Sequence, residues 1–325
     1  MKRRALLVAG GAWLAAAAAR AFAQAPKVPR RIAVLFPGTQ SGYRSRFEAF
    51  RSELKKLGYV EGRDNLIEAR WAEDRTDQLA ALAAELVALG PAVIVTASSA
   101  GVIACKKATS VIPIVFATAG TPVEQGFVAS LARPGGNVTG VSIHVMDAKL
   151  VEMARQALPR AQRLAMLVHD GDPMSGSTID IFVAAAGKFE FAPVVVRVRR
   201  VEELAQAFDQ VIRERADALH LPSLTFMGSN ARYLIERALA AKLPLLSASE
   251  ETTAAGGLLS YGTDRLESYR RTAVLVDKIL RGAKPGDLPV EQPERFQLVV
   301  NLKTAKAIGV TLSPVTMLRA TKVIE

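Results

Sequence analysis

The chain has 325 residues, half of them hydrophobic, which is enough for two α/β domains of ordinary size. Its formal net charge is +11, but the basic residues are scattered and only 6% of the residues are aromatic, which argues against a nucleic-acid partner. The single cysteine, Cys105, excludes an internal disulfide, and the three histidines lie too far apart to pair at metal-ligand spacing.

The N-terminal residues have the pattern of a secretory signal peptide. Basic residues at 2–4 precede an apolar run over 5–19, and small residues flank a cleavage point after Ala23. The run is short and rich in alanine, unlike a membrane anchor. No cysteine lies near the cleavage point, so no lipid anchor is expected. Residues 1–23 are therefore predicted to direct export, by the general or the twin-arginine route, to a bacterial periplasm. Their removal takes away four basic residues and lowers the net charge from +11 to +7.

The first part of the mature chain alternates short apolar segments with amphipathic ones. Phe47, Phe50, Leu54 and Leu57, for example, recur at helical spacing. The pattern predicts strands at 32–36, 66–71, 93–95 and 112–116, a helix around 47–57, a helix at 76–89 and a helix capped by Ser98 or Ser99. Such a βα alternation predicts a parallel sheet with helices on both faces.

A turn rich in glycine and proline at 133–137 interrupts this pattern, which then starts again. Strands are predicted at 138–143, 164–168, 193–198, 218–221 and 243–247, with helices at 149–158, 176–189, 201–215 and 230–241. Further elements follow at 258–261 (strand), 264–280 (helix), 296–301 (strand) and 302–308 (helix), with a proline-rich connection at 285–293. The predicted fold class is α/β, with two doubly wound parallel-sheet lobes and a cleft between them.

Nothing in the sequence assembles a nucleophile, a base and an orienting group. No glycine-rich phosphate loop follows a strand, and no Gly-x-Ser-x-Gly elbow occurs. Ser52 and Lys55 have the Ser-x-x-Lys spacing, but they lie within an amphipathic helix without a companion motif. Cys105 stands among apolar residues and is expected to be buried. No catalytic residue, cofactor or metal site is predicted.

Polar residues gather instead where the predicted strands end. Ligands of open α/β sheets bind beyond these carboxyl ends, where helix N-termini offer free N–H groups that suit anions. The candidate ligand-binding residues are Ser98, Ser99, Thr118, Thr121, Ser142, Asp172, Ser175, Ser223, Thr225, Ser249 and Tyr261. For any one of them a helix cap without ligand contact is the alternative. As a set they predict a polar cleft that binds a small molecule without reacting with it.

Several long runs resemble a known family over nearly all of the mature chain. The most specific are FRSELKKLGYVEG at 50–62, LARPGGNVTG at 131–140 and AGGLLSYG at 255–262, with others at 112–116, 269–271, 276–285, 287–293 and 296–305. Together they resemble the bacterial ABC-transporter substrate-binding family related to tryptophan- and tyrosine-binding periplasmic proteins. The chain departs from that pattern at 120–123 and in the segments 169–175 and 222–229.

The resemblance implies a type I periplasmic-binding-protein fold, in which three crossings join two lobes around a ligand. It places the crossings near 139–142, 250–257 and 284–293. Lobe 1 then comprises 28–140 and 255–283, and lobe 2 comprises 141–252 and 290–325. On this division Tyr261 lies beside Ser98 and Ser99 on the lobe 1 wall of the cleft.

The same resemblance implies a function and partners. We expect a monomeric solute receptor that closes on a small polar ligand and delivers it to an ABC permease in the inner membrane. An amino acid or related carboxylate is the favoured ligand, and a neutral sugar or nucleoside is the alternative. A secreted sensor for a membrane receptor and a periplasmic enzyme are the other functions considered.

Overall fold

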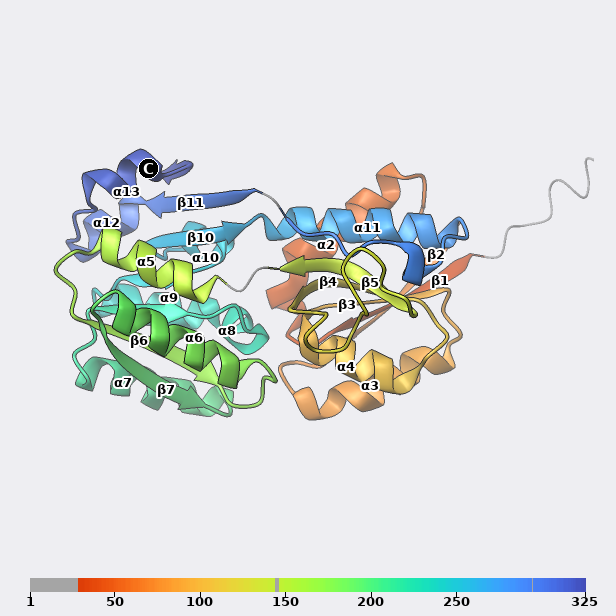
Figure 1. Ribbon diagram of the computed structural model, residues 1–325, viewed down its shortest axis with the longest axis horizontal. Coiled ribbons are helices and arrows are strands. Elements are labelled where there is room, and N and C mark those ends of the chain that lie inside the picture. Colours follow the sequence, from red (N-terminus) through yellow and green to blue (C-terminus); the bar gives the residue numbers. More distant parts are fainter. Residues whose placement is uncertain (1–28, 144–145, 294) are drawn as a thin grey trace, which may run out of the picture.

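The computed structural model describes residues 29–143, 146–293 and 295–325. The predicted signal peptide lies outside these residues. Two lobes stand side by side, each built on one β-sheet with helices packed against it (Figure 1). Within the described residues, no helix is both long enough and apolar enough to cross a membrane.

Lobe 1 contains a five-stranded, wholly parallel sheet in the order β2-β1-β3-β4-β5. The strands are β1 (Arg30–Phe36), β2 (Asn65–Trp71), β3 (Val93–Thr96), β4 (Ile114–Gly120) and β5 (Val138–Ile143). Helices α2 (Gln40–Lys56) and α11 (Arg265–Leu280) cover one face, and α3 (Leu79–Ala88) and α4 (Ser98–Ala108) cover the other, with the short η1 (Thr76–Gln78) leading into α3. Successive residues of β1 enter the two apolar cores in turn, as the period of two requires for a strand buried on both sides.

Lobe 2 contains a seven-stranded sheet in the order β12-β11-β10-β9-β8-β6-β7. The strands are β6 (Arg163–His169), β7 (Ala192–Val198), β8 (Ala218–Leu221), β9 (Leu245–Ser247), β10 (Leu259–Thr263), β11 (Phe296–Asn301) and β12 (Lys322–Ile324). The helices are α5 (Asp147–Ala157), α6 (Ser175–Lys188), α7 (Leu204–Arg213), α8 (Thr225–Ser229), α9 (Ala231–Ala240), α10 (Glu250–Ala254), α12 (Leu302–Ile308) and α13 (Pro314–Arg319). The predicted α/β class is confirmed, although β10 and β11 pair antiparallel.

One strand lies in a different lobe from the one predicted. The sequence placed 255–283 in lobe 1, but β10 pairs with β9 and β11 of the lobe 2 sheet. Only the following helix, α11, packs against lobe 1. The βα pattern could not show this, because the chain crosses between a strand and the helix that directly follows it.

Three crossings connect the lobes. The first follows β5, which continues to Ile143, so the predicted crossing at 139–142 lies inside a strand. The second lies between β10 and α11, near Asp264, and not at 250–257, where α10 and the start of β10 belong to lobe 2. The third precedes β11. Beside it Glu291 bridges to Val141 and forms a two-pronged ion pair with Arg271, at 2.6 and 2.8 Å. These contacts tie the end of β5, the helix α11 and the last connection together on the hinge side.

Candidate functional site: a cavity between the lobes

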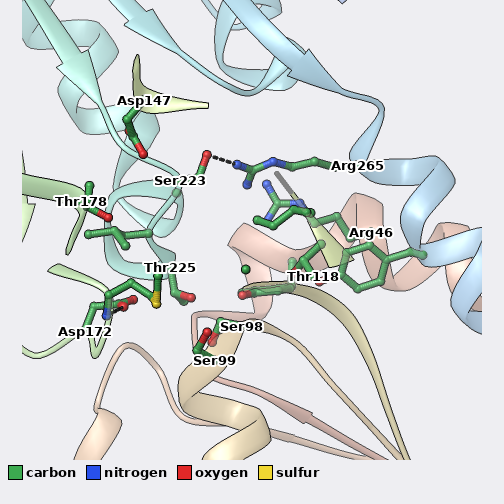
Figure 2. Close-up of a pocket in the computed structure, with 17 residues that line it drawn as sticks. Arg46, Ser98, Ser99, Thr118, Asp147, Asp172, Thr178, Ser223, Thr225 and Arg265 are labelled. Atoms are coloured by element: carbon green, nitrogen blue, oxygen red, sulfur yellow. Dashed lines mark hydrogen bonds between the residues drawn. The ribbon is translucent and has the colours of Figure 1, made fainter. Parts of the chain in front are cut away.

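A cavity of about 70 Å³ lies between the two lobes, and both contribute to its walls. That volume is small beside the pockets that hold drug-sized ligands. Polar and charged side chains point into it from both sides (Figure 2). The lobes are therefore drawn together around a space suited to a small, polar molecule.

The lobe 1 wall is built from two neighbouring helices that each supply one tyrosine and one arginine. Tyr43 and Arg46 stand three residues apart on α2, and Arg265 and Tyr269 stand four apart on α11, so each pair shares one helix face. The Asp264 side chain caps the start of α11 by accepting from the backbone N–H of Glu267 at 3.1 Å. This cap makes Arg265 the first helical residue after the crossing and holds it at the mouth of the cleft.

The two arginines differ in their partners. Arg46 pairs with Glu251 across the cleft at 2.8 Å. Burial lowers the pKa of Arg46, and Glu251 more than offsets that effect and raises it. Arg265 forms no ion pair within the described residues; its Nη2 donates to Ser223 Oγ at 2.9 Å. Burial, with the nearby charge of Arg46, lowers the pKa of Arg265, and the Glu251 carboxylate only partly opposes this effect. A positive charge without an ion-paired carboxylate of its own therefore faces the cavity.

The carboxyl ends of β3 and β4 supply the rest of this wall. Ser98 has a left-handed backbone, with φ of 60°, and its buried Oγ makes no hydrogen bond within the described residues. It follows Ala97, the N-cap of α4, so Ser98 and Ser99 begin the helix and do not cap it as predicted. Thr118 lies beside the hydroxyl of Tyr269, whose pKa is raised by burial. The left-handed backbone of Ser98 is strained, and such strain is typical of functional sites.

The lobe 2 wall carries the opposite charge. Asp172 accepts from the backbone N–H of Met174 at 2.9 Å, and burial raises its pKa. Asp147, in the first turn of α5, is buried, and its Oδ1 lies 2.6 Å from His220 Nε2. Thr178 of α6 and the hydroxyls of Ser223 and Thr225, which follow β8, complete this wall.

Contacts outside the cavity hold the lobes together. Besides its pairing with Arg46, Glu251 accepts from Ser45 Oγ at 3.0 Å. At another point along the interface Asn230 Nδ2 lies 3.5 Å from Asp74 Oδ2. The structure is thus a closed form, in which ligand exchange requires the lobes to separate.

Six of the eleven predicted ligand-binding residues line the cavity: Ser98, Ser99, Thr118, Asp172, Ser223 and Thr225. The other five lie elsewhere. The Thr121 hydroxyl accepts from Gln125 Nε2, and the buried backbone N–H of Ser142 donates to Glu291. Ser175 donates to the carbonyl of His169, and Ser249 precedes α10 beside a second interlobe crevice. Tyr261 stacks on Phe296 in lobe 2, with ring centroids 5.9 Å apart. These side chains serve local structure in the closed form.

Comparison with known proteins identifies the family of the chain. Residues 31–324 match the family model described as ABC transporter substrate binding protein. The chain belongs to this family. A "Tyrosine-binding protein" of Clostridioides difficile is 25% identical to it over 261 residues, 80% of this chain and 75% of the relative.

Two solved structures of similar proteins cover most of this ABC transporter substrate-binding protein. One, from Streptococcus pneumoniae, is described as an ABC domain in complex with L-Trp; it is 25% identical, with a TM-score of 0.81, over 90% of this chain and 100% of that one. A conserved domain protein from Vibrio cholerae is 26% identical, with a TM-score of 0.84, over 90% of this chain and 99% of the other. The expected family and the expected role as the solute-binding part of an ABC transporter are thereby confirmed.

Sequence reasoning found Asp172 but missed the other three charged residues of this substrate-binding protein's cavity, Arg46, Asp147 and Arg265. Arg46 falls on the inward stripe of α2 between Tyr43 and Phe50, where an arginine is unusual. That position was the available signal. Arg265 and Asp147 gave no such signal, because each begins a helix, where polar residues are common.

Proposed function

We propose that the cavity binds a small carboxylate, with an amino acid as the favoured ligand, for delivery to an ABC permease. The ligand enters between separated lobes and stabilises the closed form through contacts with both walls. Release to the permease follows when the lobes open again.

The lone charge of Arg265 carries this proposal. A guanidinium withdrawn from water without a carboxylate partner is costly, and a bound anion removes that cost. Arg46 adds a second positive charge, and the phenols of Tyr43 and Tyr269 offer hydrogen bonds and flat apolar faces. Guanidinium groups recognise carboxylates with two parallel hydrogen bonds. A neutral sugar would leave this charge uncompensated.

An amino acid suits both walls. Its carboxylate would face the lobe 1 arginines, and its ammonium group the lobe 2 carboxylates. The relatives named for tyrosine and solved with L-Trp support the same class. The small cavity volume favours a compact ligand in the closed form.

The remaining parts of the proposal concern where and how the protein works. Residues 1–23 would direct export, and the mature protein would act in the periplasm as a monomer. The ligand would be returned unchanged. Within the described residues there is no cluster of histidine, cysteine and acidic side chains that could hold a metal ion.

Titration calorimetry on purified mature protein tests the proposal. A panel of L-amino acids and simple carboxylates is compared with the corresponding amides. We expect carboxylates to bind and their amides to bind at least tenfold more weakly. Arg265→Gln, which keeps donors but removes the charge, should weaken carboxylate binding on the order of 10- to 100-fold.

A matched control lies on the same helix. Arg270 is partly exposed and pairs with Glu267 at 3.0 Å, so Arg270→Gln should leave affinity unchanged. Tight binding of neutral sugars with none of any carboxylate would overturn the proposal. So would chemical change of a bound compound, followed by mass spectrometry, which would indicate an enzyme.

A further inference from the structure

We propose that Asp147, oriented by the buried His220, binds the ammonium group of the ligand and restricts the site to amino acids over other carboxylates. This inference rests on the proposed function, because it assumes a ligand whose carboxylate faces Arg265. It adds a specificity-determining residue, Asp147, and a positioning residue, His220.

The Asp147 carboxylate is held at one oxygen. Its Oδ1 lies 2.6 Å from His220 Nε2, and the two side chains are among the most buried polar groups of lobe 2. The His220 ring is itself fixed by parallel stacking on Phe182, with centroids 5.7 Å apart. With Nε2 as the donor, the imidazole orients the carboxylate.

The rest of the carboxylate is directed at the cavity. Asp147 lines it, and within the described residues its side chain has no second hydrogen-bond partner. A carboxylate oxygen that is buried without a hydrogen-bond donor is costly. A ligand ammonium group supplies that donor.

The arrangement of the two walls fits a zwitterion. In Figure 2 Asp147 and Thr178 lie on the lobe 2 side, Arg265 enters from the lobe 1 side, and Ser223 lies between them in contact with the guanidinium. An α-amino acid carries its carboxylate and ammonium on one carbon, so a single head group can meet both charges. Asp172 is a weaker candidate, because the backbone N–H groups of Met174 and Thr225 already interact with its carboxylate and burial raises its pKa.

The test compares matched ligand pairs by calorimetry on wild type and Asp147→Asn. L-phenylalanine is paired with 3-phenylpropanoate, L-tryptophan with 3-(indol-3-yl)propanoate, and L-leucine with 4-methylpentanoate. In each pair that binds, the affinity of wild type should be higher for the amino acid than for its deaminated partner. Asp147→Asn should weaken the amino acid on the order of 10- to 100-fold while changing its deaminated partner less than about threefold. Asp170→Asn, a lobe 2 carboxylate paired with Arg197 at 2.7 Å, is the charge-matched control.

The outcomes separate this inference from the proposed function. Asp147 is not an ammonium site if wild type binds deaminated carboxylates with the same affinity as amino acids. The same conclusion follows if Asp147→Asn weakens binding of both members of a pair equally. In either case the carboxylate proposal stands. If no carboxylate binds at all, the proposed function fails first. Thermal unfolding without ligand shows whether Asp147→Asn is folded.

His220 is tested by rescue. His220→Leu removes the donor and should reduce the preference for the amino acid over its deaminated partner. His220→Gln, which can still donate to Asp147, should restore much of that preference. If the two variants lower affinity for both ligands to the same extent, His220 has only a structural role.

Discussion

The two walls of the cavity have opposite charge and different support. The lobe 1 wall presents Arg46 and Arg265 from the faces of long helices, α2 and α11. The lobe 2 wall presents Asp147 and Asp172 from the first turn of α5 and the loop after β6. When the lobes are apart, these charged side chains lie at the surface of each lobe, where water hydrates them.

Closure changes the balance between these walls. Bringing the lobes together removes water from both, and only one of the four charged groups, Arg46, gains an ion-pair partner from the other lobe in the described structure. The ligand is expected to supply the others. The contrast indicates that a zwitterion couples the walls better than an ion of either sign, and that closure without ligand is disfavoured.

The largest effect should come from Arg46, which serves the cavity and the interlobe contact together. Arg46→Gln removes a cavity charge and leaves Glu251 without its partner across the cleft. We expect carboxylate affinity to fall about 100-fold, or ~2.7 kcal/mol. Calorimetry measures this, with the exposed Arg44→Gln on the same helix as the control.

Glu251→Gln distinguishes the two roles of Arg46. It removes the interlobe ion pair but leaves both cavity arginines, so its effect should stay within about tenfold. Equal losses of carboxylate affinity in Arg46→Gln and Glu251→Gln would mean that Arg46 acts only as a contact between the lobes. Arg265 would then be the one arginine of the lobe 1 wall that binds the ligand.

A smaller effect should follow pH, through Asp74 at the lobe interface. Burial in the closed form raises its pKa to about 6, and Glu73 adds to this, while Ser229 and Asn230 act to lower it. In an open form, where the carboxyl is hydrated, its pKa would return toward its ordinary value. The closed form then binds the proton more tightly, so closure becomes more favourable as the pH falls through about 6 and less favourable above it.

Apparent ligand affinity should therefore be several-fold higher at pH 5.5 than at pH 7.5. Asp74→Asn should abolish most of this dependence, whereas Asp77→Asn, an exposed carboxylate nearby, should retain it. The same pH profile in wild type and Asp74→Asn would assign the effect to another group. Calorimetry at the two pH values, with a ligand that does not titrate between them, is the measurement.

The sequence predicted most elements of both lobes because their apolar periodicity is local. The helices α6 and α11 and the other strands of lobe 1 were expected close to their observed bounds, whereas α2 begins at Gln40, well before 47, and β4 continues past 116 to Gly120. The lobe membership of β10 could not be predicted, since it depends on pairing with β9 and β11, which are distant in sequence. The short elements α8, α10, α13 and β12 were missed because a few residues carry no clear period.

The site was half predictable for a related reason. Residues at or just beyond the carboxyl ends of β3, β4 and β8, such as Ser98, Thr118 and Ser223, could be placed at the cavity from topology alone. Arg46, Asp147 and Arg265 come from helices, and only the packing of α2, α5 and α11 reveals them. Tyr261 was assigned to the wrong lobe because the second crossing was predicted before β10, one strand too early.

The smallest effect is expected at Tyr261, which tests that correction. Its ring is half-buried against the lobe 2 core and stacks on Phe296, and it does not line the cavity. Tyr261→Leu should leave ligand affinity within about twofold of wild type and lower the free energy of unfolding by ~1–2 kcal/mol, through lost packing. Calorimetry and urea denaturation measure the two quantities separately. A tenfold loss of affinity with unchanged stability would return Tyr261 to the ligand site and would mean that the lobe 2 wall described above is incomplete.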